Sequence, residues 1–60
     1  MRDQAIYSKG LQLLSQGTQY RNLNSKLRAW QERETGGALS KVQMYAVMAR
    51  VGLARFNPAG

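Results

Sequence analysis

Apolar residues recur along the chain at intervals of three and four positions, the spacing that places side chains on one face of an α-helix. The clearest run lies in the middle of the chain, with steps of three, four and three. It consists of Tyr20, Leu23, Leu27 and Trp30. Glycines separate this run from a periodic segment on each side. The pattern predicts three helices, over about residues 3–15, 18–34 and 40–52.

The residues at the expected helix ends have side chains suited to capping. Asp3 and Thr18 can act as N-caps of the first two helices. Ser40 and Gln43 match a capping box at the start of the third helix. Each helix is followed by glycine, and Leu53 can fold back as the apolar partner of the last helix end. These glycines are Gly17, Gly36, Gly37 and Gly52.

The three apolar faces can close around one core, so we expect an all-α fold, a compact bundle of three short helices. Residues 1–53 form a single small domain in this scheme. Residues 54–60 are expected to be an extended C-terminal tail, because the residue before Pro58 disfavours helix. Gly10 falls on the apolar face of the first helix, where it predicts either a close helix approach or a break.

The inventory of reactive side chains argues against catalysis. The chain has no cysteine and no histidine, which removes thiolate and imidazole metal ligands and the usual general base at neutral pH. Its carboxylates are Asp3, Glu32 and Glu34. The last two lie two positions apart, so a helix turns them about 200° from each other and they cannot flank one reacting bond. We therefore expect no enzyme activity, no cofactor, no metal site and no small-molecule substrate.

Charge narrows the choice of partner. Nine lysines and arginines against three acids give a net charge of +6 on 60 residues. Such a chain is attracted to nucleic acid, to anionic membrane and to acidic protein surfaces, although charge can also serve solubility alone. Several of these cations lie on the expected second helix, on the two flanks of its apolar run. They are Arg21 and Arg28 on one flank and Lys26 and Arg33 on the other.

These flanking cations have two interpretations. Their aliphatic stems can cover the edges of the core while their charged ends stay hydrated. Alternatively, the charged ends form a surface for phosphate or acidic groups. Glu32 lies four positions after Arg28 and is expected to neutralise part of that surface.

The order of helix, glycine-containing turn and capped helix resembles a helix-turn-helix unit in outline, although the turn is longer than in the compact form. In that arrangement Lys41, Gln43 and Arg50 would reach bases or phosphates from the start and outward side of the third helix. The second helix would hold phosphates. The leading hypothesis is therefore a small regulator that binds nucleic acid, with duplex DNA as the expected form.

The alternative hypothesis starts from apolar residues outside the inward stripe of the third helix. A helix that is apolar on nearly two faces is either enclosed by the fold or covered by another chain. The chain would then be an adaptor or inhibitor, of the kind that phages and plasmids encode, docking on a larger host enzyme. A homodimer is a further option, because the core is small for independent folding. The interface residues would be Val42, Tyr45, Ala46, Ala49, Leu53 and Phe56.

A membrane role ranks third among the hypotheses. The longest apolar stretch, residues 44–53, is interrupted by Arg50 and is too short to cross a bilayer. The first residues carry an acid early and lack the apolar run of a signal peptide. A cytoplasmic location is therefore the default expectation.

Overall fold

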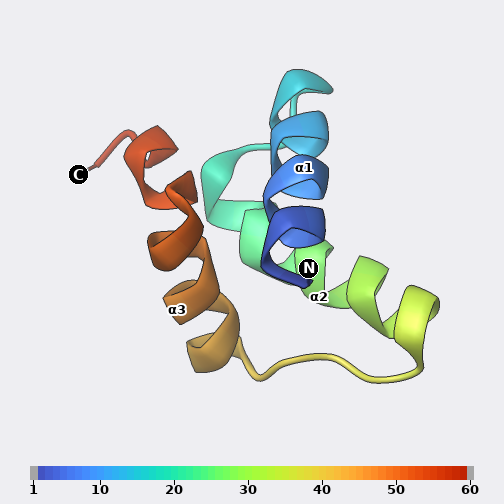
Figure 1. The fold of residues 1–60 in the computed structure, drawn as a ribbon. Coiled ribbons are helices and arrows are strands. Elements are labelled where there is room, and N and C mark those ends of the chain that lie inside the picture. The colour runs from blue at the N-terminus through green and yellow to red at the C-terminus, as the bar shows by residue number, and fades with distance from the viewer. Residues whose placement is uncertain (1, 60) are drawn as a thin grey trace.

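The computed structural model describes residues 2–59, with Arg2 described for its backbone alone, and it confirms an all-α bundle. Its helices are α1 (Arg2–Ser15), α2 (Tyr20–Thr35) and α3 (Lys41–Val51), followed by a short 3₁₀-helix, η1 (Leu53–Phe56). Each of the three α-helices contacts the other two, as Figure 1 shows. Residues 36–40 cross from the end of α2 to the start of α3 as an extended connection.

The core is built by the apolar faces that the periodicity predicts. Its fully enclosed side chains come from α1, α2, α3 and η1, and half-buried apolar residues surround them. The enclosed side chains are Ile6, Leu23, Leu27, Met44, Met48 and Leu53. Because no single helix can enclose its own apolar stripe, each helix is stabilised mainly by packing against the other two.

The N-terminal end of α3 is capped as the sequence predicts, whereas the N-terminal ends of α1 and α2 differ from the prediction. The hydroxyl of Ser40 accepts from the backbone N–H of Gln43 at 3.2 Å, and the Gln43 side chain accepts from the Ser40 N–H at 3.1 Å. The capping box is therefore confirmed. In contrast, Asp3 lies inside the first turn of α1, and the N-cap of α2 is Gln19, which makes no side-chain capping bond. The predictions of Asp3 and Thr18 as N-caps are therefore wrong.

Gly10 and Gly52 both serve the packing of the chain after α3. Gly52 ends α3 with a φ of 96°, a left-handed conformation that glycine adopts without strain. The chain then turns back and buries Leu53 against α1. A Cβ atom added at Gly10 would lie 2.7 Å from Leu53 Cδ1, so α1 continues through this position and glycine leaves room for the leucine. Of the two predictions for Gly10, the close approach is the one observed, although the neighbour is η1.

The segment after Gly52 differs in part from the expected tail. Residues 53–56 form η1 rather than part of an extended tail, and Leu53 belongs to the core. The first residues of the predicted tail of residues 54–60 are therefore helical rather than extended. Among the described residues after Gly52, those after Phe56 lie outside a helix.

Candidate functional site

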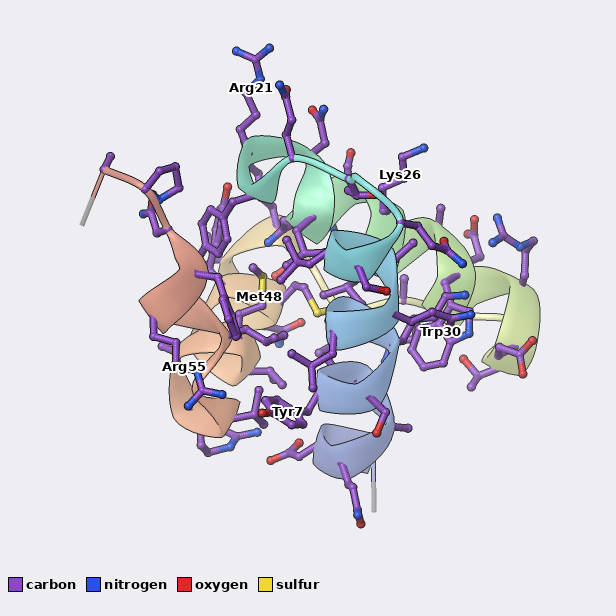
Figure 2. The ribbon with its side chains drawn as sticks, turned by 90° about the horizontal axis from the view of Figure 1, so that it is seen from above. Tyr7, Arg21, Lys26, Trp30, Met48 and Arg55 are labelled. Atoms are coloured by element: carbon purple, nitrogen blue, oxygen red, sulfur yellow. The ribbon has the colours of Figure 1, made fainter. Side chains whose placement is uncertain are left out.

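The outward side of α2 carries three exposed cations, Arg21, Lys26 and Arg33. None of them forms an ion pair with a residue that the structure describes. The Arg21 Nε donates to the side chain of the exposed Gln19 at 2.8 Å, which leaves its terminal nitrogens available. Figure 2 shows the Arg21 and Lys26 side chains pointing away from the bundle. These side chains therefore offer their charge to solvent or to a ligand.

Arg28, the fourth cation of α2, has a different environment. Its side chain is half-buried, and its Nε donates to Asn24 Oδ1 at 2.7 Å, one helical turn earlier. No ion pair joins it to Glu32, so the expected partial neutralisation by Glu32 is wrong. The guanidinium is instead held by a neutral amide.

Asn24 connects α2 to α3. Its side chain is 2% exposed, and its Nδ2 donates to the backbone carbonyl oxygen of Lys41 at 3.0 Å. The same amide lies 3.9 Å from Met48 Sδ. A buried amide requires such partners, because an unpaired polar group costs about 1–3 kcal/mol. Asn24 thus holds Arg28 on one side and the first turn of α3 on the other.

Gln31 makes the second polar connection from α2, one heptad after Asn24. Its side chain is 6% exposed, and its Oε1 accepts from the backbone N–H of Leu39 at 2.9 Å. This bond anchors the connection that leads into α3. The sequence analysis missed both amides, although a signal was present. Positions 24 and 31 lie seven apart and directly beside Leu27 on the helical wheel, so they border the predicted apolar run.

Two polar residues of α3 that were expected to face nucleic acid have partners within the chain. Gln43 belongs to the capping box described above. Arg50 is bound to Asp3 of α1 by two hydrogen bonds, from Nε at 2.8 Å and from Nη2 at 3.1 Å. The hydrogen bonds that Arg50 donates to Asp3, and then the negative charge of Asp3, raise the pKa of Arg50 above its ordinary value. Lys41, the third predicted residue of this helix, is exposed.

The outward face of α3 is apolar. Val42 is 78% exposed and Tyr45 42% exposed, and Ala46 and Ala49 are exposed beside them. These four residues follow the spacing i, i+3, i+4 and i+7, so they form one continuous stripe, which we call the α3 stripe. The structure therefore brings four of the six residues of the predicted protein interface together on one face of α3. Leu53 is fully buried, and its assignment to this interface is wrong.

Phe56, the last residue of the predicted interface, lies apart from the α3 stripe. It is 40% exposed and lines a shallow hollow of about 530 Å³ together with Tyr20 and Arg21 of α2. The Arg55 guanidinium carbon stands 4.9 Å from the centre of its ring, and Arg55 Nη2 donates to the Tyr7 hydroxyl at 3.1 Å. Phe56 is thus associated with the start of α2.

A larger open groove lies between the start of α1, the end of α2 and the connection to α3. Its volume is about 610 Å³, and most of its wall is apolar. Ile6, Trp30 and Leu39 contribute to this wall, and Glu34 adds a carboxylate. None of the predicted binding residues lines this groove, so it is separate from both predicted sites.

Two features are absent from the described part of the chain. No three side chains of the metal-binding types histidine, cysteine, aspartate and glutamate lie close together there. None of the described helices combines the length and the apolar character needed to cross a membrane.

Comparisons with protein-family models, with curated proteins and with solved structures found no match to this chain. Its function therefore has to be argued from the charges, contacts and exposed surfaces described above.

Proposed function

We propose that this chain binds nucleic acid through the phosphate backbone, using the cations on the outward side of α2. The observation that supports this most is that Arg21, Lys26 and Arg33 are exposed and form no ion pair with a described residue. Each such cation can neutralise a phosphate and release a condensed counterion, which favours binding at moderate salt. The net charge of +6 adds a long-range attraction.

The proposal assigns phosphate contacts to the protein and no base reading to α3. Gln43 is engaged in the capping box, and Arg50 is engaged with Asp3. A base contact by either residue would first have to break a contact within the chain. Binding should therefore depend strongly on salt and weakly on nucleotide sequence. As a regulator, the chain would act by occupying or covering nucleic acid.

The test is a titration of labelled oligonucleotides of about 16 nucleotides, duplex and single-stranded, between about 50 and 200 mM salt. We expect a Kd on the order of 1 µM near physiological salt, the tight end of the non-specific range. We also expect a slope of log K against log salt of about −3 for duplex, since each phosphate contact contributes about −0.9. Weak binding that disappears below physiological salt would mean that the charge serves solubility.

A second candidate function rests on the α3 stripe. Val42 is the most exposed large apolar residue described, and no described element covers the stripe around it. In this alternative the chain is an adaptor or inhibitor that docks on a larger protein. Val42→Asp and Ala49→Asp would then abolish capture of the partner, while nucleic-acid affinity would change only by the added charge.

A further inference from the structure

We propose that Arg28, Lys41 and Tyr45 form a binding unit for one nucleotide of a single strand, with Asn24 as the residue that positions Arg28. The unit rests on the proposed nucleic-acid binding and specifies its ligand: a phosphate next to an unpaired base. Arg28 would bind the phosphate, Lys41 would add charge, and Tyr45 would stack on the base.

The side of α3 that faces α2 is defined by Asn24. This amide binds the carbonyl oxygen of Lys41 and approaches Met48, so it enters the groove between successive turns of α3. Tyr45 lies one turn after Lys41 on the same side of the helix. The opposite flank of α3 is the one that lines a hollow with Asp3 of α1. Its residues there are Gln43, Ala46, Val47 and Arg50.

The direction of α2 places Arg28 beside the start of α3. Asn24 contacts the Lys41 carbonyl, and Gln31, two turns further along α2, contacts the backbone of Leu39. Arg28 lies on α2 between these two contact points, and α2 crosses α3 there, as Figure 1 shows. Arg28 and the backbone of Lys41 therefore flank Asn24 at the α2–α3 contact, and Tyr45 follows Lys41 by one turn.

The chemistry of Arg28 suits a phosphate oxygen pair. Its Nε is occupied by Asn24 at 2.7 Å, and its two terminal nitrogens have no hydrogen bond to a described residue. A planar guanidinium held in this way has lost rotational freedom before the ligand arrives, and it can bind two phosphate oxygens at once. Lysine at the same position would keep the charge and lose both the positioning bond and the paired geometry.

Tyr45 provides the preference for single strands. Its ring is 42% exposed and belongs to a stretch of chain without carboxylates, since Glu34 is the last acid in the sequence. An exposed ring beside cations is the arrangement on which unpaired bases stack. In a duplex both faces of each base are already stacked, so this contact is lost and only the phosphate contacts remain.

The test compares two charge-conserving variants, Arg28→Lys and Arg21→Lys. Both residues lie on the same flank of α2, seven positions apart, and Arg21 has only the exposed Gln19 as partner. The probe is fluorescein-labelled oligo(dT) of about 16 nucleotides, followed by anisotropy. We expect Arg28→Lys to weaken binding about tenfold and Arg21→Lys to weaken it less than about twofold. Equal effects would overturn the role of Asn24 and Arg28.

The stacking contact is tested with Tyr45→Ala and Tyr45→Phe on the same probe and on a duplex of equal length. Tyr45→Ala should weaken binding to oligo(dT) about tenfold, Tyr45→Phe should retain it, and duplex binding should stay unchanged in both. An equal loss on both probes, or none on either, would overturn the single-strand unit. If the unmodified chain binds neither probe, the proposed nucleic-acid function itself fails. Far-UV circular dichroism checks that each variant is folded.

Discussion

The outward sides of α2 and α3 differ in what they offer to a partner. On α2, Arg21, Lys26 and Arg33 are exposed and form no ion pair with a described residue. On α3 the outward side is the apolar α3 stripe, which begins at Val42, and the neighbouring Gln43 and Arg50 have partners within the chain. Both helices bury one face in the core, yet one exposes charge and the other exposes hydrocarbon.

This difference shows that the spacing of polar residues does not determine which of them are available for binding. Gln43 and Arg50 have the helical spacing expected of a recognition surface, but each has a partner within the chain. Arg28 shows the opposite case, because its contact with Asn24 orients the guanidinium and leaves the terminal nitrogens without a hydrogen bond to a described residue. Availability is decided by neighbours, and several of these neighbours are far away in sequence.

The largest expected effect is the difference in stability between a variant of a buried apolar residue and a variant of an exposed one near α3. Leu53→Ala should lower the free energy of unfolding by about 2–5 kcal/mol, because it leaves a cavity beside Gly10. Val42→Ala should change it by less than about 0.5 kcal/mol. Urea unfolding followed by circular dichroism measures both. Similar values for the two variants would contradict the division between the core and the α3 stripe.

The next effect concerns the charges of α2. Replacing Arg21 and Arg28 together by glutamine should weaken duplex binding about tenfold or more and should reduce the salt slope by about 1.8, or about 0.9 for each lost phosphate contact. Val42→Gln is the matched control, because it changes the α3 stripe without altering charge. If Val42→Gln weakens binding more than the double variant, the binding face has been assigned to the wrong helix.

A smaller effect tests the structural role of the capping box. Ser40→Ala removes the acceptor for the Gln43 N–H and should lower the free energy of unfolding by about 1 kcal/mol. Oligonucleotide affinity of the folded variant should remain that of the unmodified chain. A selective loss of affinity with unchanged stability would restore the start of α3 as a reading surface for bases.

The smallest effect concerns the Asp3–Arg50 pair. Asp3→Asn removes a negative charge and releases Arg50 from its partner. One more cation then becomes available, so the salt slope of binding should become steeper by at most about 0.9. Titrations of the variant and the unmodified chain at matched salt concentrations measure this. A shallower slope would indicate that the pair itself supports the binding surface.

The sequence predicted the features that depend on local pattern. Apolar spacing predicted the three helices, and Ser40 with Gln43 predicted the capping box, because these signals lie within a few residues of one another. The α3 stripe was predicted for the same reason, apart from Leu53, whose burial depends on its packing across the bundle against Gly10.

The features that were missed depend on contacts between distant segments. Asn24 and Lys41 are 17 positions apart, and Asp3 and Arg50 are 47 positions apart. No local pattern specifies such pairs, because they form only when the helices pack in one arrangement. Asn24 and Gln31, polar residues on the border of the apolar run, received no role from the sequence, although the packed helices bury them.

The measurement that tests the central claim most directly is an NMR titration of the chain with oligo(dT), read at the backbone amides. The proposed binding predicts the largest shifts along the outward side of α2 and around Arg28, Lys41 and Tyr45, with small shifts at Val42, Ala46 and Ala49. Shifts confined to those last three residues, with none on α2, would contradict it and would place binding on the part of the α3 stripe away from Tyr45.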